Sequence, residues 1–229
     1  MSMPAASALD FIRDGVEMRE GLVPERDLRL VVSEITVESA LLGKAGIRNV
    51  EKKVAGIARL AAAPVLVGIA RDFLGGEARL VRALFFDKTP GRNWAIPWHQ
   101  DKTVAVNRRV EMDGWGPWSE KEGVCHVQPP CPVLDRMLAV RLHIDPCDED
   151  NGCLRVIPGS HRSGLLKPRE IERVVEASDA VPCVAAAGDA VIMRPHVLHS
   201  SRRSVSPSHR RVIHFEYSDY ELPSGIRWA

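Results

Sequence analysis

The sequence lacks an excess of charge of either sign. Its 31 lysines and arginines stand against 30 aspartates and glutamates, which leaves a formal net charge of +1. Nucleic acids and anionic membranes attract proteins through extended positive surfaces, so neither is predicted as a partner. Long apolar runs are also missing, because Arg71 and Asp72 end the longest one. No segment reaches the roughly 18 residues that indicate a membrane-spanning helix.

Cysteine is scarce and follows no familiar pattern. The five cysteines are an odd number and none stands in a CxxC pair. The N-terminus lacks the basic-then-apolar order of a secretory signal, so the sequence favours reduced thiols in a cytoplasmic protein. A zinc site built from Cys125, His126 and Cys131 is an alternative, although its spacing differs from that of the familiar zinc fingers.

The composition that remains is typical of an ordered globular protein, with 45% hydrophobic and 27% charged residues. A chain of 229 residues suits a single domain. We divide it into a scaffold over residues 1–76, with a strand and helices, and a β-rich core over 77–220. The oligomeric state is left open.

Helices are predicted in the first third of the chain. Apolar residues recur at helical spacing over 25–42, with Glu25 and Asp27 in the first turn. A second helical region over about 50–73 is interrupted at Pro64 and ends at Gly75-Gly76. A strand is expected within 9–23 and a helical excursion over about 168–177.

The pattern changes to short strands after residue 77. Apolar strand candidates occupy 80–86, 103–106, 138–144, 154–157, 181–185, 190–193 and 211–217. The Asn151-Gly152 turn signal predicts that 138–144 and 154–157 are neighbouring antiparallel strands. Many short strands after two helices indicate an antiparallel barrel or sandwich with helices on one side. The irregular stretch 107–132 has the length of a functional lid.

The stretch Pro97-Trp98-His99-Gln100-Asp101 contains the chemistry on which the interpretation depends. Residues two apart on an extended segment point to the same side, so His99 and Asp101 can bind one cation together. A histidine from the late segment 194–199 would complete two histidines and one carboxylate on one face of the ion. That ligand set is typical of non-haem Fe(II) oxygenases.

Several fragments together resemble the phytanoyl-CoA dioxygenase family of Fe(II)- and 2-oxoglutarate-dependent oxygenases. Besides 98–101, they are 151–154, 156–161, Gly188-Asp189, 199–201 and 210–213, and they occur in family order. The resemblance implies a double-stranded β-helix, a jelly-roll barrel, with His99, Asp101 and His199 as catalytic iron ligands. Family spacing favours His199 over His196 as the second histidine, because Ser201 and Arg210 follow it at the expected distances.

The resemblance also implies how 2-oxoglutarate binds. Arg210 would hold the distal carboxylate through two parallel hydrogen bonds, helped by Ser201. Arg211 is adjacent and points to the opposite face of the strand, so only one of the two reaches inward. Gln100 and Leu84 match family positions that contact the cosubstrate.

Further residues are candidates for substrate contacts, with core or surface packing as the alternative for each. Arg141 and His143 share one face of a strand and would meet either an acidic substrate group or the cosubstrate. The tryptophans Trp98, Trp115 and Trp118 would border the substrate.

The predicted activity is hydroxylation of an unactivated C–H bond in a small polar metabolite. Fe(II) would be the cofactor, 2-oxoglutarate and O₂ would be consumed, and succinate and CO₂ would be released. The carboxylate at Asp101 disfavours halogenation, since halogenating relatives replace it with a small residue. Desaturation, epoxidation, cyclisation or demethylation at the same centre is an alternative. A metal-binding, cupin-like barrel without oxygenase activity is another, although it leaves Arg210 and Ser201 without a task.

Overall fold

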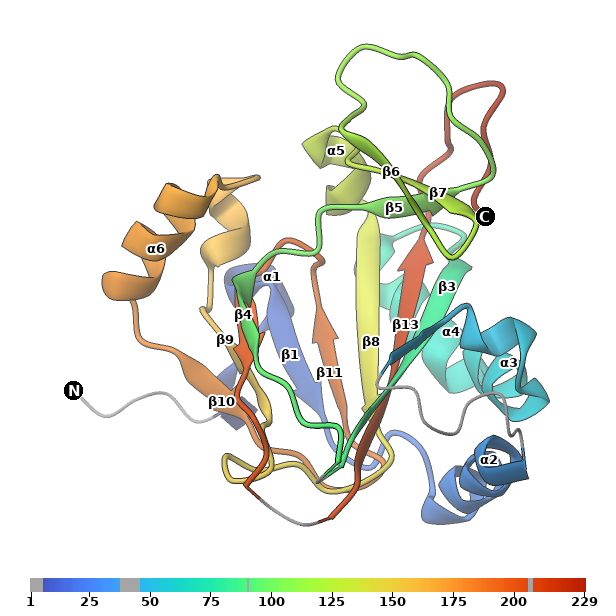
Figure 1. Cartoon of the computed structure of the whole chain (residues 1–229), viewed down its shortest axis with the longest axis vertical. Helices are drawn as coiled ribbons and strands as arrows, with labels where there is room; N and C mark the ends of the chain where they lie inside the picture. Colours follow the sequence, from blue (N-terminus) through green and yellow to red (C-terminus); the bar gives the residue numbers. More distant parts are fainter. Residues whose placement is uncertain (1–5, 38–45, 90, 206–207) are drawn as a thin grey trace.

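The computed structural model describes residues 6–37, 46–89, 91–205 and 208–229, and a six-stranded antiparallel sheet is its largest element (Figure 1). The strand order is β1-β11-β8-β13-β3-β2. In that order the strands span Val16–Arg19, Ala190–Met193, Met137–His143, Arg210–Ser218, Arg79–Lys88 and Gly46–Arg48. The N-terminal segment therefore supplies both edge strands of this sheet.

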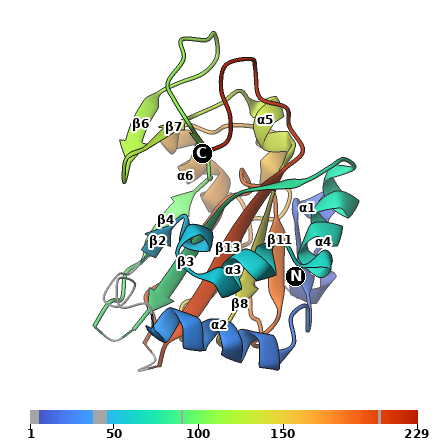
Figure 2. The same ribbon diagram turned by 90° about the vertical axis from the view of Figure 1, so that its right-hand side faces the viewer.

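Helices cover one face of the large sheet (Figure 2). They are α2 (Glu25–Val37), α3 (Ala55–Ala61) and α4 (Pro64–Leu74). Alternate strand residues such as Val140, Ile213 and Phe215 pack against them in the main hydrophobic core. Because strand side chains alternate between faces, the residues between these point to the opposite side of the sheet.

A four-stranded antiparallel sheet faces that opposite side. Its order is β10-β9-β12-β4, with strands at Val181–Cys183, Leu154–Val156, His199–Ser201 and Ile96–His99. Val191 and Met193 of the large sheet pack on Leu154 and Val156 of the small one. The two sheets thus enclose a second core, as a jelly roll does, and the predicted fold class is confirmed.

The remaining elements surround these sheets. A three-stranded sheet, β5-β7-β6, is formed by Val104–Val106, Val124–Val127 and Trp118–Lys121, and α5 (Cys131–Asp135) follows it. Helix α6 (Pro168–Glu176) lies next to β4 of the small sheet (Figure 1). The short helices are α1 (Phe11–Asp14) and the 3-10 helices Ala6–Ala8, Val50–Lys52 and Ser160–Ser163. None of the described helices is long and apolar enough to cross a membrane.

The helical predictions largely hold. Pro64 occupies the first turn of α4, so the second helical region is interrupted where predicted, and Gly75 ends α4 with a left-handed φ of 78°. The predicted helix over 25–42 is helical through Val37, and its last residues lie outside the described ranges.

Two strand predictions were wrong. The strands before and after Asn151-Gly152 are not neighbours: β8 pairs with β11 and β13, whereas β9 pairs with β10 and β12 in the other sheet. Asn151 instead closes a local turn with Asp148. This turn lies in the connection that leads from β8 of the large sheet to β9 of the small sheet. The stretch 107–132 is also not irregular throughout, because β6 and β7 form a hairpin within it.

Candidate metal centre and cosubstrate pocket

Two histidines meet where β4 and β12 pair at the edge of the small sheet. His99 ends β4, His199 begins β12, and the two are direct partners across the antiparallel pair. Their ring centroids lie 4.2 Å apart. Asp101 follows β4 by two residues, and its backbone N–H donates to the Pro195 carbonyl at 2.9 Å. This bond ties the segment after β4 to the segment before β12.

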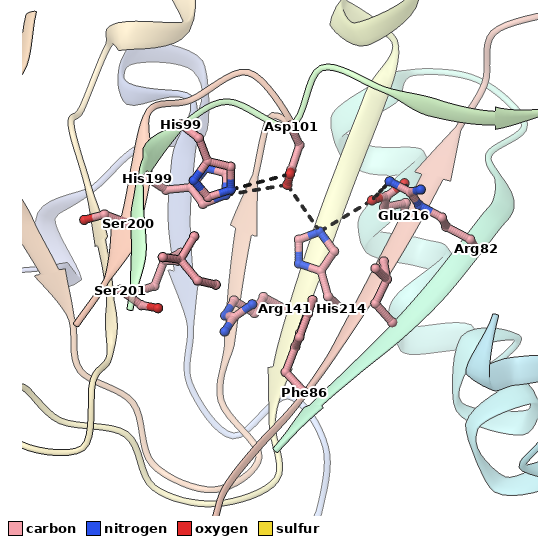
Figure 3. Close-up of a pocket in the computed structure, with 13 residues that line it drawn as sticks. Arg82, Phe86, His99, Asp101, Arg141, His199, Ser200, Ser201, His214 and Glu216 are labelled. Atoms are coloured by element: carbon pink, nitrogen blue, oxygen red, sulfur yellow. Dashed lines mark hydrogen bonds and ion pairs between the residues drawn. The ribbon is translucent and has the colours of Figure 1, made fainter. Parts of the chain in front are cut away.

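Backbone hydrogen bonds fix the orientation of both imidazoles. His99 Nδ1 lies 2.9 Å from the Pro97 carbonyl oxygen, and His199 Nδ1 lies 2.8 Å from that of Val197. A carbonyl oxygen only accepts, so each Nδ1 donates a proton and each Nε2 presents a lone pair. The Nε2 atoms lie 3.8 Å and 3.6 Å from the two carboxylate oxygens of Asp101 (Figure 3). Three donor atoms therefore face one point.

The electrostatic environment favours the metal-binding forms of His199 and Asp101. Burial lowers the pKa of His199 to about 4, against the opposing effect of Asp101. Burial tends to raise the pKa of Asp101, but the positive charges that His199, His99, His214 and Arg82 can carry outweigh it and lower that pKa to about 2. A neutral imidazole and an ionised carboxylate are the forms that bind metals.

The donor set fits Fe(II). Two imidazole nitrogens and one carboxylate oxygen on one side of an ion leave the opposite positions open, as in non-haem Fe(II) oxygenases. The hydrogen bonds from Nδ1 to backbone carbonyls fix the tautomer and the orientation of each ring, as is usual for histidines that bind a metal. His99, Asp101 and His199 would hold the iron.

A pocket opens beside this centre, between the two sheets. The small sheet contributes Ile96, Leu154, Ser200 and Ser201, in addition to the histidines. The large sheet contributes Arg82, Leu84, Phe86, Arg141, His214 and Glu216. The walls therefore combine apolar surface with charged groups of both signs.

A buried guanidinium lies at the start of β13. Arg210, the first residue of β13, is 1% exposed, and its Nε and Nη1 have no hydrogen-bond partner among the described residues. The carboxylates that influence it electrostatically, Asp87 and Asp145, are bound to His209 and Arg211. An unpaired buried cation is costly, so this site fits a ligand carboxylate.

Other polar groups gather near Arg210. Lys88 is opposite it in the pairing of β3 and β13, and its ammonium donates to Ser201 Oγ at 3.0 Å and to the Arg202 carbonyl at 2.6 Å. Burial, together with the charges of Arg210 and Arg141, lowers the pKa of Lys88 to about 7. Arg141 lies over the Phe86 ring, 5.6 Å from its centroid, and its Nε also has no partner among the described residues.

A polar chain extends from the metal ligands toward the other side of the pocket. His214 Nε2 lies 3.9 Å from Asp101 Oδ2 and 3.8 Å from Glu216 Oε1 (Figure 3). Arg82 donates to both oxygens of Glu216, at 2.7 and 2.8 Å, and both side chains are buried. The pKa of His214 is lowered to about 3, chiefly by burial. These groups give the pocket a polar wall beside Asp101.

The structure brings some of the predicted residues to the pocket and places others elsewhere. His99, Asp101, His199, Leu84, Ser201 and Arg141 line it, whereas Arg210 is buried outside the lining. Gln100 does not, because its amide is engaged by Gly164, Leu166 and His196 backbone groups. Trp98 packs against Leu166 and Leu198, and Trp115 and Trp118 pack around the three-stranded sheet. His143 is fully buried and outside the pocket lining.

Sequence reasoning misses Lys88, Arg82, His214 and Glu216. A signal is present in β13, where His214 and Glu216 alternate with Ile213, Phe215 and Tyr217 of the main core, but it is weaker in β3, where Leu84 and Phe86 separate Arg82 from Lys88. The strand prediction takes 80–86 as an apolar run, which leaves Arg82 out. An alternation of this kind, in a strand with one buried face, indicates a polar interior on the other face.

Two facing antiparallel sheets that direct two histidines and one carboxylate at one point are typical of a class of protein, the non-haem iron oxygenases that use 2-oxoglutarate. The model of the phytanoyl-CoA dioxygenase (PhyH) family matches residues 34–212, and the chain belongs to this family. Iron and 2-oxoglutarate are accordingly its cofactor and cosubstrate.

Individual relatives agree with this assignment. L-proline trans-4-hydroxylase from Streptomyces griseoviridis is 25% identical over 225 residues, which cover 87% of this chain and 74% of that protein. AviO1 from Streptomyces viridochromogenes Tue57 has a similar fold, with a TM-score of 0.69 at 22% identity, covering 97% of this chain and 99% of that one. EctD from S. alaskensis, solved with 2-oxoglutarate and 5-hydroxyectoine, has a TM-score of 0.70 at 20% identity, covering 91% and 73%.

Proposed function

We propose that this protein hydroxylates an unactivated C–H bond of a small polar metabolite that carries a carboxylate, with release of succinate and CO₂. The observation that supports it best is the position of the open face of the metal centre, which adjoins a small pocket with charged walls. When bound, iron and 2-oxoglutarate supply the oxidising power by activating O₂. The residues of this chain bind, orient and shield the reactants.

The cosubstrate would lie between the metal centre and Arg210. We assign its distal carboxylate to the Arg210 guanidinium, because Nε and Nη1 have no partner among the described residues and a guanidinium binds a carboxylate through charge-assisted hydrogen bonds. Ser201 adds a hydroxyl on the same side, and Lys88 holds that hydroxyl in place. Leu84 and Phe86 form the apolar wall along the carbon chain of the cosubstrate.

The substrate would be small and acidic. Arg141 lines the same pocket as His99, Asp101 and His199, so it lies within reach of a group held beside the iron. We assign the substrate carboxylate to Arg141. The relative that acts on L-proline, a small amino acid, supports this size and charge. Glu216 and His214 complete the opposite wall, where a cationic or hydrogen-bonding group of the substrate would fit.

Succinate release from 2-oxoglutarate, measured with a panel of amino acids and small carboxylates, tests this proposal. A true substrate stimulates release, and mass spectrometry of its product shows one added oxygen atom. Loss of two hydrogens instead would indicate desaturation.

The same assay tests the role of Arg141. Arg141→Met should raise KM for the identified substrate while the affinity for 2-oxoglutarate changes little, and Arg141→Lys should recover part of the loss. Arg155→Met is the matched control, because Arg155 lies over Trp98 and outside the pocket lining. Unchanged substrate affinity in Arg141→Met would contradict the assignment.

A further inference from the structure

A second group of metal-binding side chains lies outside the iron centre. Cys131 and Asp135, from α5, meet His196, which stands three residues before His199. One ligand atom from each residue lies within 4.8 Å of the other two. His196 Nε2 and Asp135 Oδ1 are 3.3 Å apart. Among the described residues, only this group and the iron triad bring three such side chains together.

Local geometry explains why these residues converge. Residues four apart on a helix lie on one face, so Cys131 and Asp135 both point to the same side of α5. The segment before β12 passes that face, and Arg194 Nη1 donates to the Asp135 carbonyl at 2.7 Å. This bond holds the end of α5 against the chain that carries His196.

The donor chemistry differs from that of the iron centre. A thiolate, an imidazole and a carboxylate are the ligands that Zn²⁺ prefers, with Zn–S near about 2.3 Å and Zn–N near about 2.0–2.1 Å. The iron triad contains no sulfur, and Mg²⁺ or Ca²⁺ would favour oxygen ligands alone. The separations in the cluster suit a tetrahedral ion with small side-chain adjustments.

His196 gives a second, independent observation. Its side chain is 1% exposed and its Nδ1 has no hydrogen-bond partner among the described residues. Its other nitrogen, Nε2, faces Asp135 Oδ1 across 3.3 Å, so a cation between these two atoms would bind the buried imidazole and the carboxylate together. The Asp135 side chain, in contrast, is 53% exposed, so an ion can reach the site from solvent and keep a water as its fourth ligand.

We propose that Cys131, Asp135 and His196 form a second metal site that binds Zn²⁺, separate from the iron centre. Binding releases the thiol proton of Cys131 to solvent and joins the end of α5 to the segment before His199. Helix α5 leads directly into β8, the strand that carries Arg141. The ion would therefore stabilise the connection between two elements that contribute to the pocket.

Co²⁺ substitution tests the site with a readout that the iron triad cannot give. In metal-free protein titrated with Co²⁺ alone, a thiolate-to-cobalt absorption band in the near ultraviolet and strong tetrahedral bands in the visible are expected. Cys131→Ser should remove the thiolate band. Cys125→Ser is the matched control, since Cys125 is likewise partly exposed and lies on β7, and it should keep the band.

Two more variants distinguish this site from the iron centre and from a change in folding. Asp135→Asn changes an exposed side chain, so it should not affect folding. Because Asp135 would bind the ion directly, its loss should weaken Zn²⁺ binding by more than the roughly 10- to 100-fold that is typical when a residue hydrogen-bonded to a metal ligand is replaced. His199→Ala should keep the cobalt–thiolate band while losing the iron centre, which separates this site from the oxygenase function. Absence of the band in the wild type, or its persistence in Cys131→Ser, would overturn the proposal.

Discussion

Replacing Arg210 with methionine should weaken 2-oxoglutarate binding strongly and leave Fe(II) binding unchanged. The substitution keeps much of the buried volume but removes the two donors, Nε and Nη1, that have no protein partner among the described residues. Losing one member of a buried, hydrogen-bonded charge pair costs about 3 kcal/mol, which corresponds to a roughly 150-fold increase in Kd. Isothermal titration under anaerobic conditions, of the metal-free protein with Fe(II) and then of the Fe(II)-loaded protein with 2-oxoglutarate, measures the two affinities.

Arg211→Met is the matched control for this prediction. Arg211 is the next residue of β13, but it points outward and binds Asp145 through two side-chain hydrogen bonds of 2.7 Å. Its replacement should leave the Kd for 2-oxoglutarate unchanged and lower the free energy of unfolding by about 1 kcal/mol. The apo form of Arg210→Met should be at least as stable as the wild type, because an unpaired buried cation has been removed. Equal effects of the two variants on cosubstrate affinity would refute the reasoning.

The remaining predictions concern Lys88, Gly152 and Tyr217. Because the pKa of Lys88 is lowered to about 7, the folded protein binds fewer protons than the unfolded chain between pH 7 and the ordinary lysine pKa of 10.5. Stability should therefore rise with pH in this window, by at most about 1.4 kcal/mol per pH unit from this residue. Urea unfolding at several pH values should show a shallower rise in Lys88→Met, and parallel curves would contradict the shift. Gly152 has a φ of +79°, and an added Cβ would lie 2.4 Å from the Arg202 carbonyl oxygen that accepts from Lys88. Gly152→Ala should destabilise by more than about 2 kcal/mol and weaken 2-oxoglutarate binding, whereas Gly75→Ala, with a φ of +78° and nothing within 4 Å, should cost only about 1 kcal/mol; similar losses in both would argue against the close contact. Tyr217→Phe removes the hydrogen bond to the Ala61 carbonyl and should lower stability by about 1 kcal/mol, measured by thermal unfolding, without changing cosubstrate affinity.

The metal ligands could be predicted from the sequence because the patterns that indicate them involve only a few neighbouring residues. A His-x-Asp pair on an extended segment needs only the alternation of strand side chains, and the helix break at Pro64 needs only the geometry of proline. Both are properties of a few neighbouring residues, so no tertiary information was required.

The path of the chain after Asn151-Gly152 could not be predicted in the same way. A turn signal indicates that the chain reverses, but it does not indicate whether the next strand joins the same sheet or the facing one. Here Gly152 approaches the Arg202 carbonyl closely, and the chain crosses to the small sheet. The position of β9 is set by pairing with β10 and β12, which are distant in sequence.

The walls of the pocket depend on long-range contacts as well. Lys88 is buried beside Arg210 and Ser201 only because β3 and β13 are adjacent and the small sheet faces them. Gln100 neighbours two metal ligands in sequence, yet its amide turns to the 164–166 segment, whose proximity no local pattern indicates. Cys131 likewise meets Asp135 and His196 rather than Cys125 and His126.

The measurement that tests the central claim most directly is anaerobic titration of the metal-free protein with Fe(II) and then 2-oxoglutarate, in the wild type and in His199→Ala. We expect the weak visible charge-transfer band of the iron–2-oxoglutarate chelate in the wild type and its absence in the variant. Tight Fe(II) binding by the wild type without this band would contradict the assignment of the pocket to 2-oxoglutarate, and an unchanged band in His199→Ala would contradict the metal centre described above.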